Sequence, residues 1–249
     1  TATASRRHDM SKLDAKFLAR EVASPLLWRR QTAQRLLVER GDTSAAAELR
    51  EVLSASRAGD LQSPSARSDG SKAATATRRH VEPAALITAL RTLDGLGALT
   101  PEDVRPFVSH SADSVRVHAL QLADRWLVQP EGRALLATTL AAAATEPSPR
   151  VRIQFALSLG ESRDPQAFAL LARFARERLG VRWMDTAILS SLHQRGGEML
   201  VELLREPGGS APLLEALAKS IAASRDEAEL ARALNLLAAA RPETQATVL

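Results

Sequence analysis

The chain has 249 residues, of which 45% are hydrophobic and only 3% aromatic, and it contains no cysteine. A sequence without cysteine excludes disulfides, thiolate metal sites, a cysteine nucleophile and covalent c-type haem attachment within it. The formal net charge of +4 at pH 7 permits binding to nucleic acid or an anionic surface, but acidic residues are interspersed throughout, which favours arginines on solvated helix faces.

The apolar residues are mostly Ala and Leu, which suit closely packed helices better than a β-sandwich or barrel. We therefore expect an all-α protein. No run of 18 apolar residues occurs, so no membrane span is expected, and no signal peptide is recognisable. The sequence opens without Met and stops in what resembles the start of another helix, so we expect a fragment of a longer protein.

Residues 1–9 are polar, and we expect them to be loose. Ser11–Asp14 fits a capping box and predicts the start of a first helix, which Ser24-Pro25 ends. A second helix follows, with an apolar stripe at Trp28, Thr32, Ala33 and Leu36. Arg40–Asp42 then turns the chain, and a third helix is predicted over 44–54.

Residues 55–80 differ in kind, because Gly, Pro and Ser occur throughout and no apolar period is present. Such a segment cannot bury enough surface to offset its ordering entropy. We predict a polar insertion, at least partly disordered, between two helices of one repeat. A domain boundary is the alternative, and the immediate return of the repeat phase argues against it.

Six predicted helices carry the same apolar stripe, at positions i, i+4, i+5 and i+8. The clearest copy is Val151, Phe155, Ala156 and Leu159, for which Ser148 is the expected cap, Pro149 the first residue and Gly160 the end. The stripes begin at Trp28, Ala85, Val115, Val151, Met184 and Leu213. The other helices are predicted to begin at Thr100-Pro101, kept short by Pro106, and to span 131–145, 165–178, 198–205 (after Gly196-Gly197) and 226–240, with Pro242 opening another.

From Ala85 onward the stripes recur every 29–36 residues, which is the period of a helix pair. Each pair has one apolar face that it cannot bury alone, and stacked neighbours bury a continuous core. We therefore predict a right-handed α-solenoid (an α-α superhelix) of about six HEAT-like helix pairs over residues 10–249.

An arginine follows the first stripe residue three times, at Arg29, Arg116 and Arg152. These arginines could form a basic ladder on the concave face, or a structural ladder in which each pairs with an acid and bonds carbonyls of the neighbouring turn. The structural reading is favoured, because Leu86 and Asp185 occupy the same position in two other helices and would interrupt an anion groove.

Other side chains with chemical potential have simpler explanations. We expect His118 to be a packing or surface residue, and the small serines Ser158, Ser190 and Ser191 to allow close helix approach rather than to act as nucleophiles. No histidine is paired at i, i+4, so no metal site is expected; the remaining histidines are His8, His80, His110 and His193.

The three tryptophans, Trp28, Trp126 and Trp183, could be base-stacking platforms. Each lies in or beside an apolar stripe, so core or edge positions are favoured. Gly95-Leu96-Gly97 follows a helix rather than a strand, which argues against a phosphate-binding loop. We predict no catalytic, cofactor-binding or metal-binding residues in the chain.

Three stretches resemble the HEAT-repeat region of large exported dehydrogenase-like c-type haem proteins of planctomycetes: residues 24–42, 92–103 and 150–160. In that family a sugar-dehydrogenase-like β-propeller precedes the repeats and a cytochrome c domain follows them. The resemblance runs from about residue 10 to 195, and it carries over no catalytic or haem-ligating residue. It implies a periplasmic or exported, non-catalytic scaffold that spaces or docks the two redox domains.

Two other functions stay open. The first is nucleic-acid binding of the kind found in HEAT-like alkylpurine DNA glycosylases, which need a carboxylate facing a flipped base; Asp185, beside Trp183, is the nearest candidate. The second is a stand-alone solenoid that docks a protein partner. Salt-dependent affinity for duplex DNA would separate the first of these from the scaffold.

Overall fold

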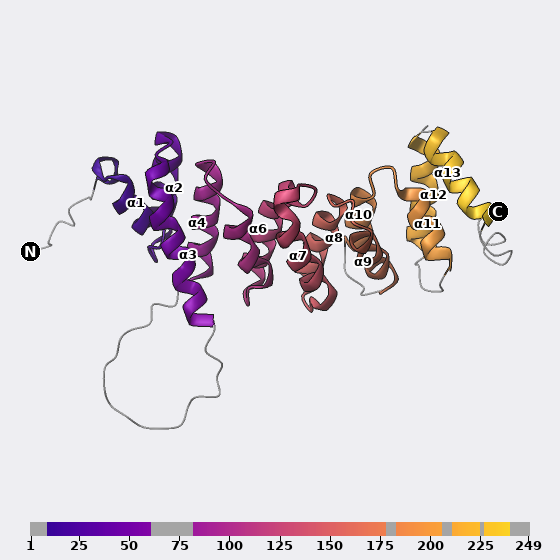
Figure 1. Cartoon of the computed structure of the whole chain (residues 1–249), viewed down its shortest axis with the longest axis horizontal. Coiled ribbons are helices and arrows are strands. Elements are labelled where there is room, and N and C mark those ends of the chain that lie inside the picture. The colour runs from indigo at the N-terminus through magenta and orange to yellow at the C-terminus, as the bar shows by residue number, and fades with distance from the viewer. Residues whose placement is uncertain (1–8, 61–81, 178–182, 206–210, 225–226, 240–249) are drawn as a thin grey trace, which may run out of the picture. The chain divides into compact units, whose positions relative to one another are not determined.

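The computed structural model describes residues 9–60, 82–177, 183–205, 211–224 and 227–239. Within these residues the fold is all-helical, without a strand, as predicted. The α-helices are α1 Ala15–Glu21, α2 Leu27–Arg40, α3 Ala46–Asp60, α4 Pro83–Gly95, α5 Pro101–Val104, α6 Asp113–Ala123, α7 Arg133–Thr145, α8 Pro149–Gly160, α9 Pro165–Arg176, α10 Met184–Ser191, α11 Gly196–Arg205, α12 Ala211–Ser224 and α13 Glu227–Ala239 (Figure 1).

The chain forms two compact units, Thr1–Ala119 and Leu120–Leu249, and α6 crosses from one to the other. In the first unit α1 packs on α2 and α3, and α4 packs on both α2 and α3. In the second unit α8, α9 and α10 lie side by side (Figure 1), and α11 contacts α9, α12 and α13. In each unit, therefore, helices pack both against their neighbours in sequence and against the next helix but one.

The predicted stripes are the core of most of these helices. All four residues are buried in the stripes that begin at Ala85, Val115 and Val151. The stripes that begin at Met184 and Leu213 bury three of four, since Leu189 is half-buried and Ala218 is exposed.

The stripe predicted for α2 is wrong. Trp28 is 54% exposed, Thr32 and Leu36 are only half-buried, and the buried face consists of Arg30, Ala33 and Leu37. The face of α2 that packs against α1 and α4 is therefore not the predicted one. Its largest apolar side chain, Trp28, lies outside that buried face.

Of three predicted helix caps, one is confirmed and two are not. Thr100 and Asp103 form a capping box at the start of α5, and the segment from Arg105 to Ser109, which contains Pro106, continues as a 3₁₀ helix. The first helix is capped by Asp14, whose carboxylate accepts a hydrogen bond from the Phe17 N–H. The predicted cap, Ser11, is therefore wrong. Ser148 makes no side-chain cap to α8; instead its own N–H donates to Glu146.

Two predicted boundaries are wrong in part. Helix α3 continues to Asp60, so residues 55–60 of the predicted insertion are helical, whereas residues 61–80 lie outside the described residues. Gly196 and Gly197 do not separate two helices, because they form the first turn of α11. A Cβ at Gly197 would meet Ala233 of α13, so its small size allows the two helices to approach closely. The segments 1–8 and 240–249, with Pro242, also lie outside the described residues.

Candidate functional site

The arginines predicted to form a ladder are structural, and the sequence places one of them wrongly. Arg116 donates from Nη1 to the His110 carbonyl at 2.6 Å, and Arg152 donates from Nε to the Glu146 carbonyl at 2.6 Å. In α2 the same bond, to a carbonyl six residues earlier, is made by Arg30 to Ser24 at 2.7 Å. Arg29 instead pairs with Glu21 of α1.

These bonds close the loop that precedes each helix. They satisfy carbonyls that the loop leaves without a partner, and Arg30 and Arg116 are each only 8% exposed. Leu86, at the corresponding position of α4, is fully buried, and Asp185 of α10 is exposed. The three arginines are therefore not available as an anion-binding row.

The described histidines and serines also have local partners. Arg91 of α4 approaches His118 Nδ1 at 3.0 Å, and because arginine can only donate, that nitrogen is the acceptor. His110 Nδ1 accepts from the Ala112 N–H. Ser190 and Ser191 bond to carbonyls within α10. A Cβ at Gly160 would overlap Ser191, so the close approach predicted at Ser191 is confirmed at the α8–α10 contact, whereas Ser190 is exposed.

Ser158 differs from that prediction, because an acidic partner lies beside it. Burial raises the pKa of Asp124 to about 6; the nearby Glu161 carboxylate acts in the same direction, and a hydrogen bond from Ser158 opposes them. Gln154 Nε2 also approaches Ser158 Oγ at 3.3 Å. Asp124 thus forms part of a polar cluster behind α8, which the sequence did not reveal because its partners are more than 30 residues away.

The tryptophans are more exposed than predicted. Trp28 and Trp183 are 54% and 60% exposed, so neither is a core residue. Trp126 is half-buried, with the Arg125 guanidinium 4.4 Å from its ring centroid. The described residues hold no cluster of three potential metal ligands, and His8 and His80 lie outside the described residues.

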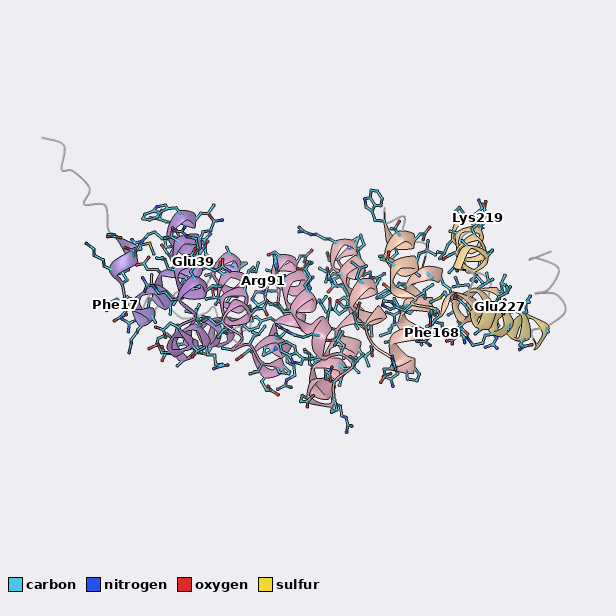
Figure 2. The ribbon with its side chains drawn as sticks, turned by 90° about the horizontal axis from the view of Figure 1, so that it is seen from above. Phe17, Glu39, Arg91, Phe168, Lys219 and Glu227 are labelled. Atoms are coloured by element: carbon cyan, nitrogen blue, oxygen red, sulfur yellow. The ribbon has the colours of Figure 1, made fainter. Side chains whose placement is uncertain are left out.

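The candidate binding site is a cleft of about 630 Å³ in the second unit, where α8 and α10 end. Its rim comes from Gly160 at the end of α8, from residues 161–163 after it, and from residues 193–195 after α10. Its floor is apolar: Leu159, Leu171 and Leu192 are buried, and Phe168 of α9, labelled in Figure 2, adds an aromatic ring. This site is not predicted from the sequence, because its lining residues come from segments that lie far apart in the chain.

The rim after α10 has an unusual backbone. His193 and Gln194 both have left-handed φ values, of 38° and 52°. A non-glycine residue in the left-handed region has a conformational free energy on the order of 1–3 kcal/mol above that of an ordinary conformation, and such residues cluster at functional sites. The Arg195 N–H bonds the Leu192 carbonyl at 2.8 Å, and the Arg195 guanidinium lies 4.0 Å from the Phe168 ring centroid. The loop is therefore held in this conformation by its neighbours.

The charges around the cleft are mixed. Arg195 is neutralised by Glu198 of α11, with Nη2 and Oε2 2.9 Å apart. Glu161 Oε1 lies 3.7 Å from His193 Nε2. Arg163 and Arg232 are exposed at the cleft. The arrangement provides cationic groups beside an apolar floor.

Comparison of the chain with family models, curated proteins and solved structures finds no match. None of the helices in the described part of the chain is long and apolar enough to cross a membrane.

Proposed function

We propose that the chain is a right-handed α-solenoid of HEAT-like helix pairs that serves as a non-catalytic scaffold or interaction domain. The observation that carries the proposal is the recurrence of one arginine-to-carbonyl bond, from Arg30, Arg116 and Arg152, at the same place in three helices. Packing of helices on the next but one within each unit supports it. Stacked helix pairs create extended surfaces, which repeat proteins use for binding.

The resemblance of residues 24–42, 92–103 and 150–160 to exported dehydrogenase-like haem proteins supplies the cellular context of this proposal. In that context the scaffold spaces or docks a β-propeller dehydrogenase domain and a cytochrome c domain in the periplasm. The parent reading frame tests the context. A propeller before the repeats and a Cys-x-x-Cys-His motif after them would support this context. If the reading frame contains neither of them, the stand-alone docking solenoid is the remaining interpretation.

Small-angle X-ray scattering tests the solenoid. A compact domain of 249 residues has a radius of gyration of about 18 Å, and stacked pairs extend along one axis. We expect a clearly larger radius and a skewed pair-distance distribution. A radius near that of a compact domain would refute the solenoid.

Nucleic-acid binding is the second candidate, and the exposure of Trp28 and Trp183 favours it. Arg29 lies 5.9 Å from the Trp28 ring centroid, which places a cation beside one platform. Fluorescence anisotropy with labelled single-stranded and duplex DNA across a salt series tests it. Affinity that falls steeply with salt and is lost in Trp28→Ala would favour this function; no binding at low salt would exclude it.

A further inference from the structure

The cleft at the ends of α8 and α10 contains two arginines that the fold does not use. Arg163 follows α8 and Arg232 lies on α13, and both side chains are exposed at the cleft. Neither makes a hydrogen bond or ion pair with another described residue. This distinguishes them from Arg30, Arg116 and Arg152, whose guanidinium groups bond loop carbonyls.

The remaining charged groups at the cleft are largely compensated. Arg195 pairs with Glu198, and Glu161 faces His193 across 3.7 Å. With both glutamates ionised and the histidine neutral, three arginines against two glutamates leave a formal charge of +1 on the lining. A positive charge on His193 would increase this formal charge further. The excess charge therefore selects an anion, and arginine guanidinium groups bind carboxylates and phosphates with paired hydrogen bonds.

The floor of the cleft selects an apolar group. Leu159 and Leu171 are buried beneath it, and Phe168 presents its ring beside them. A cleft of about 630 Å³ falls within the range of about 300–1,000 Å³ typical of small-molecule sites. The left-handed residues His193 and Gln194, fixed by the Arg195–Phe168 contact, give the rim a defined shape before any ligand arrives.

We propose that this cleft binds a small organic anion. Arg163 and Arg232 hold its carboxylate or phosphate group, and its apolar part lies against Phe168 and Leu171. The site is independent of the scaffold function, because it requires only the second unit's own residues.

Two related fluorescent probes test the proposal with the full chain. The anionic probe is 8-anilinonaphthalene-1-sulfonate, and its uncharged analogue is N-phenyl-1-naphthylamine. We expect saturable binding of one sulfonate probe per chain, at least tenfold tighter than the neutral probe and weakened by salt. Equal affinity for the two probes, or no saturable binding, would overturn the proposal.

Matched variants locate the binding. Arg163→Gln with Arg232→Gln should weaken sulfonate binding at least tenfold and leave the neutral probe within twofold. The control is Arg105→Gln with Arg150→Gln, which removes two exposed arginines outside the cleft and should change neither probe. Equal losses in the two double variants would show that net charge, and not this cleft, attracts the probe. Circular dichroism checks that each variant is folded.

Competition separates the two anion chemistries. Benzoate and phenyl phosphate should each displace the sulfonate probe, and the better competitor identifies the preferred group. Acetate and inorganic phosphate, which lack the apolar part, should compete at least tenfold less well. Phe168→Leu should weaken the aromatic competitors but leave the salt dependence unchanged. Displacement by acetate as effective as by benzoate would contradict the apolar half of the site.

Discussion

Helices α2 and α8 carry the same apolar spacing in the sequence but bury different faces. Both end at or next to a glycine, and both carry an arginine bonded to a carbonyl six residues earlier, Arg30 in α2 and Arg152 in α8. Helix α8 buries its whole apolar stripe, whereas α2 leaves Trp28 more than half exposed.

The difference shows which feature the two helices have in common. The apolar residue at the first position of the stripe is exposed in α2, where it is Trp28, and buried in α8, where it is Val151. The arginine keeps its partner in both. A helix in this chain is therefore oriented by the bond that closes the preceding loop together with the neighbours available to it, and apolar spacing alone is an incomplete guide.

The largest expected effect contrasts Phe155 of α8 with Trp28 of α2. Phe155 is fully buried, so Phe155→Ala should lower the free energy of unfolding by about 3–5 kcal/mol. Trp28 is 54% exposed, so Trp28→Ala should cost less than about 1 kcal/mol. Urea denaturation followed by circular dichroism measures both. Equal losses would mean that Trp28 is buried and that the two helices are equivalent.

The sequence predicted the helices and most of the core, because an amphipathic stripe reports directly which face a helix buries. The stripes from Ala85, Val115 and Val151 are buried completely. It failed at α2, where Trp28 and Leu36 fit the pattern by chance and Arg30, a charged residue, is buried instead. Burial of an arginine depends on a carbonyl at the right distance, which local spacing does not reveal.

The candidate site was less predictable. Arg163, Phe168, Arg195 and Arg232 come from separate segments and meet only when the helices of the second unit pack. The polar cluster at Asp124 has the same origin, because its partners Ser158, on α8, and Glu161, directly after α8, are distant from it in the sequence. Such sites depend on tertiary contacts, for which one sequence gives no direct signal.

The second prediction concerns Asp124, the buried carboxyl beside α8. Its pKa, raised by burial to about 6 from an ordinary value of 3.8, means that the folded chain holds this proton more tightly than the unfolded chain. Its contribution to stability is therefore fully present below about pH 4 and is lost as the pH rises through about 6. A raised pKa of this size corresponds to at most about 3 kcal/mol.

Asp124→Asn removes the ionisation. It should stabilise the protein by up to about 3 kcal/mol at pH 8 and have little effect at pH 4. The control is Glu39→Gln on α2, an exposed carboxylate labelled in Figure 2, which should change stability by less than about 0.5 kcal/mol at both pH values. Urea midpoints at pH 4, 6 and 8 measure the trend, and an effect of Asp124→Asn independent of pH would contradict it.

The third prediction separates the two glycines at the helix ends. Gly41, after α2, has a φ of 61° and free space around it, whereas a Cβ at Gly160 of α8 would overlap the Ser191 backbone. Gly160→Ala should cost about 1–3 kcal/mol through overpacking, and Gly41→Ala about 1 kcal/mol through backbone strain.

Asparagine distinguishes the two causes, because it tolerates the left-handed region and is larger than alanine. We expect Gly41→Asn to recover part of the stability lost in Gly41→Ala, and Gly160→Asn to be less stable than Gly160→Ala. Thermal midpoints measure all four variants. Recovery at Gly160 would show that its backbone, and not the contact with α10, requires glycine.

The fourth prediction tests the feature that the two helices share, the bond from an arginine to a loop carbonyl. Arg30→Met and Arg152→Met keep most of the apolar stem but leave the Ser24 and Glu146 carbonyls without their partner, at a cost of about 1–3 kcal/mol each. Arg152→Met also removes an ion pair, because Arg152 Nη1 lies 2.8 Å from Glu177 Oε2. Arg29→Met is the matched control in α2, because it removes the partly exposed ion pair with Glu21 and the contact with the Trp28 ring but no bond to a loop carbonyl. An exposed ion pair of this kind is worth about 0–1 kcal/mol. If Arg29→Met costs as much as Arg30→Met, the bond to the loop carbonyl has no special role in stabilising α2. If Arg30→Met and Arg152→Met cost the same while Arg29→Met is nearly neutral, one polar contact sets equivalent positions in two helices whose apolar faces differ.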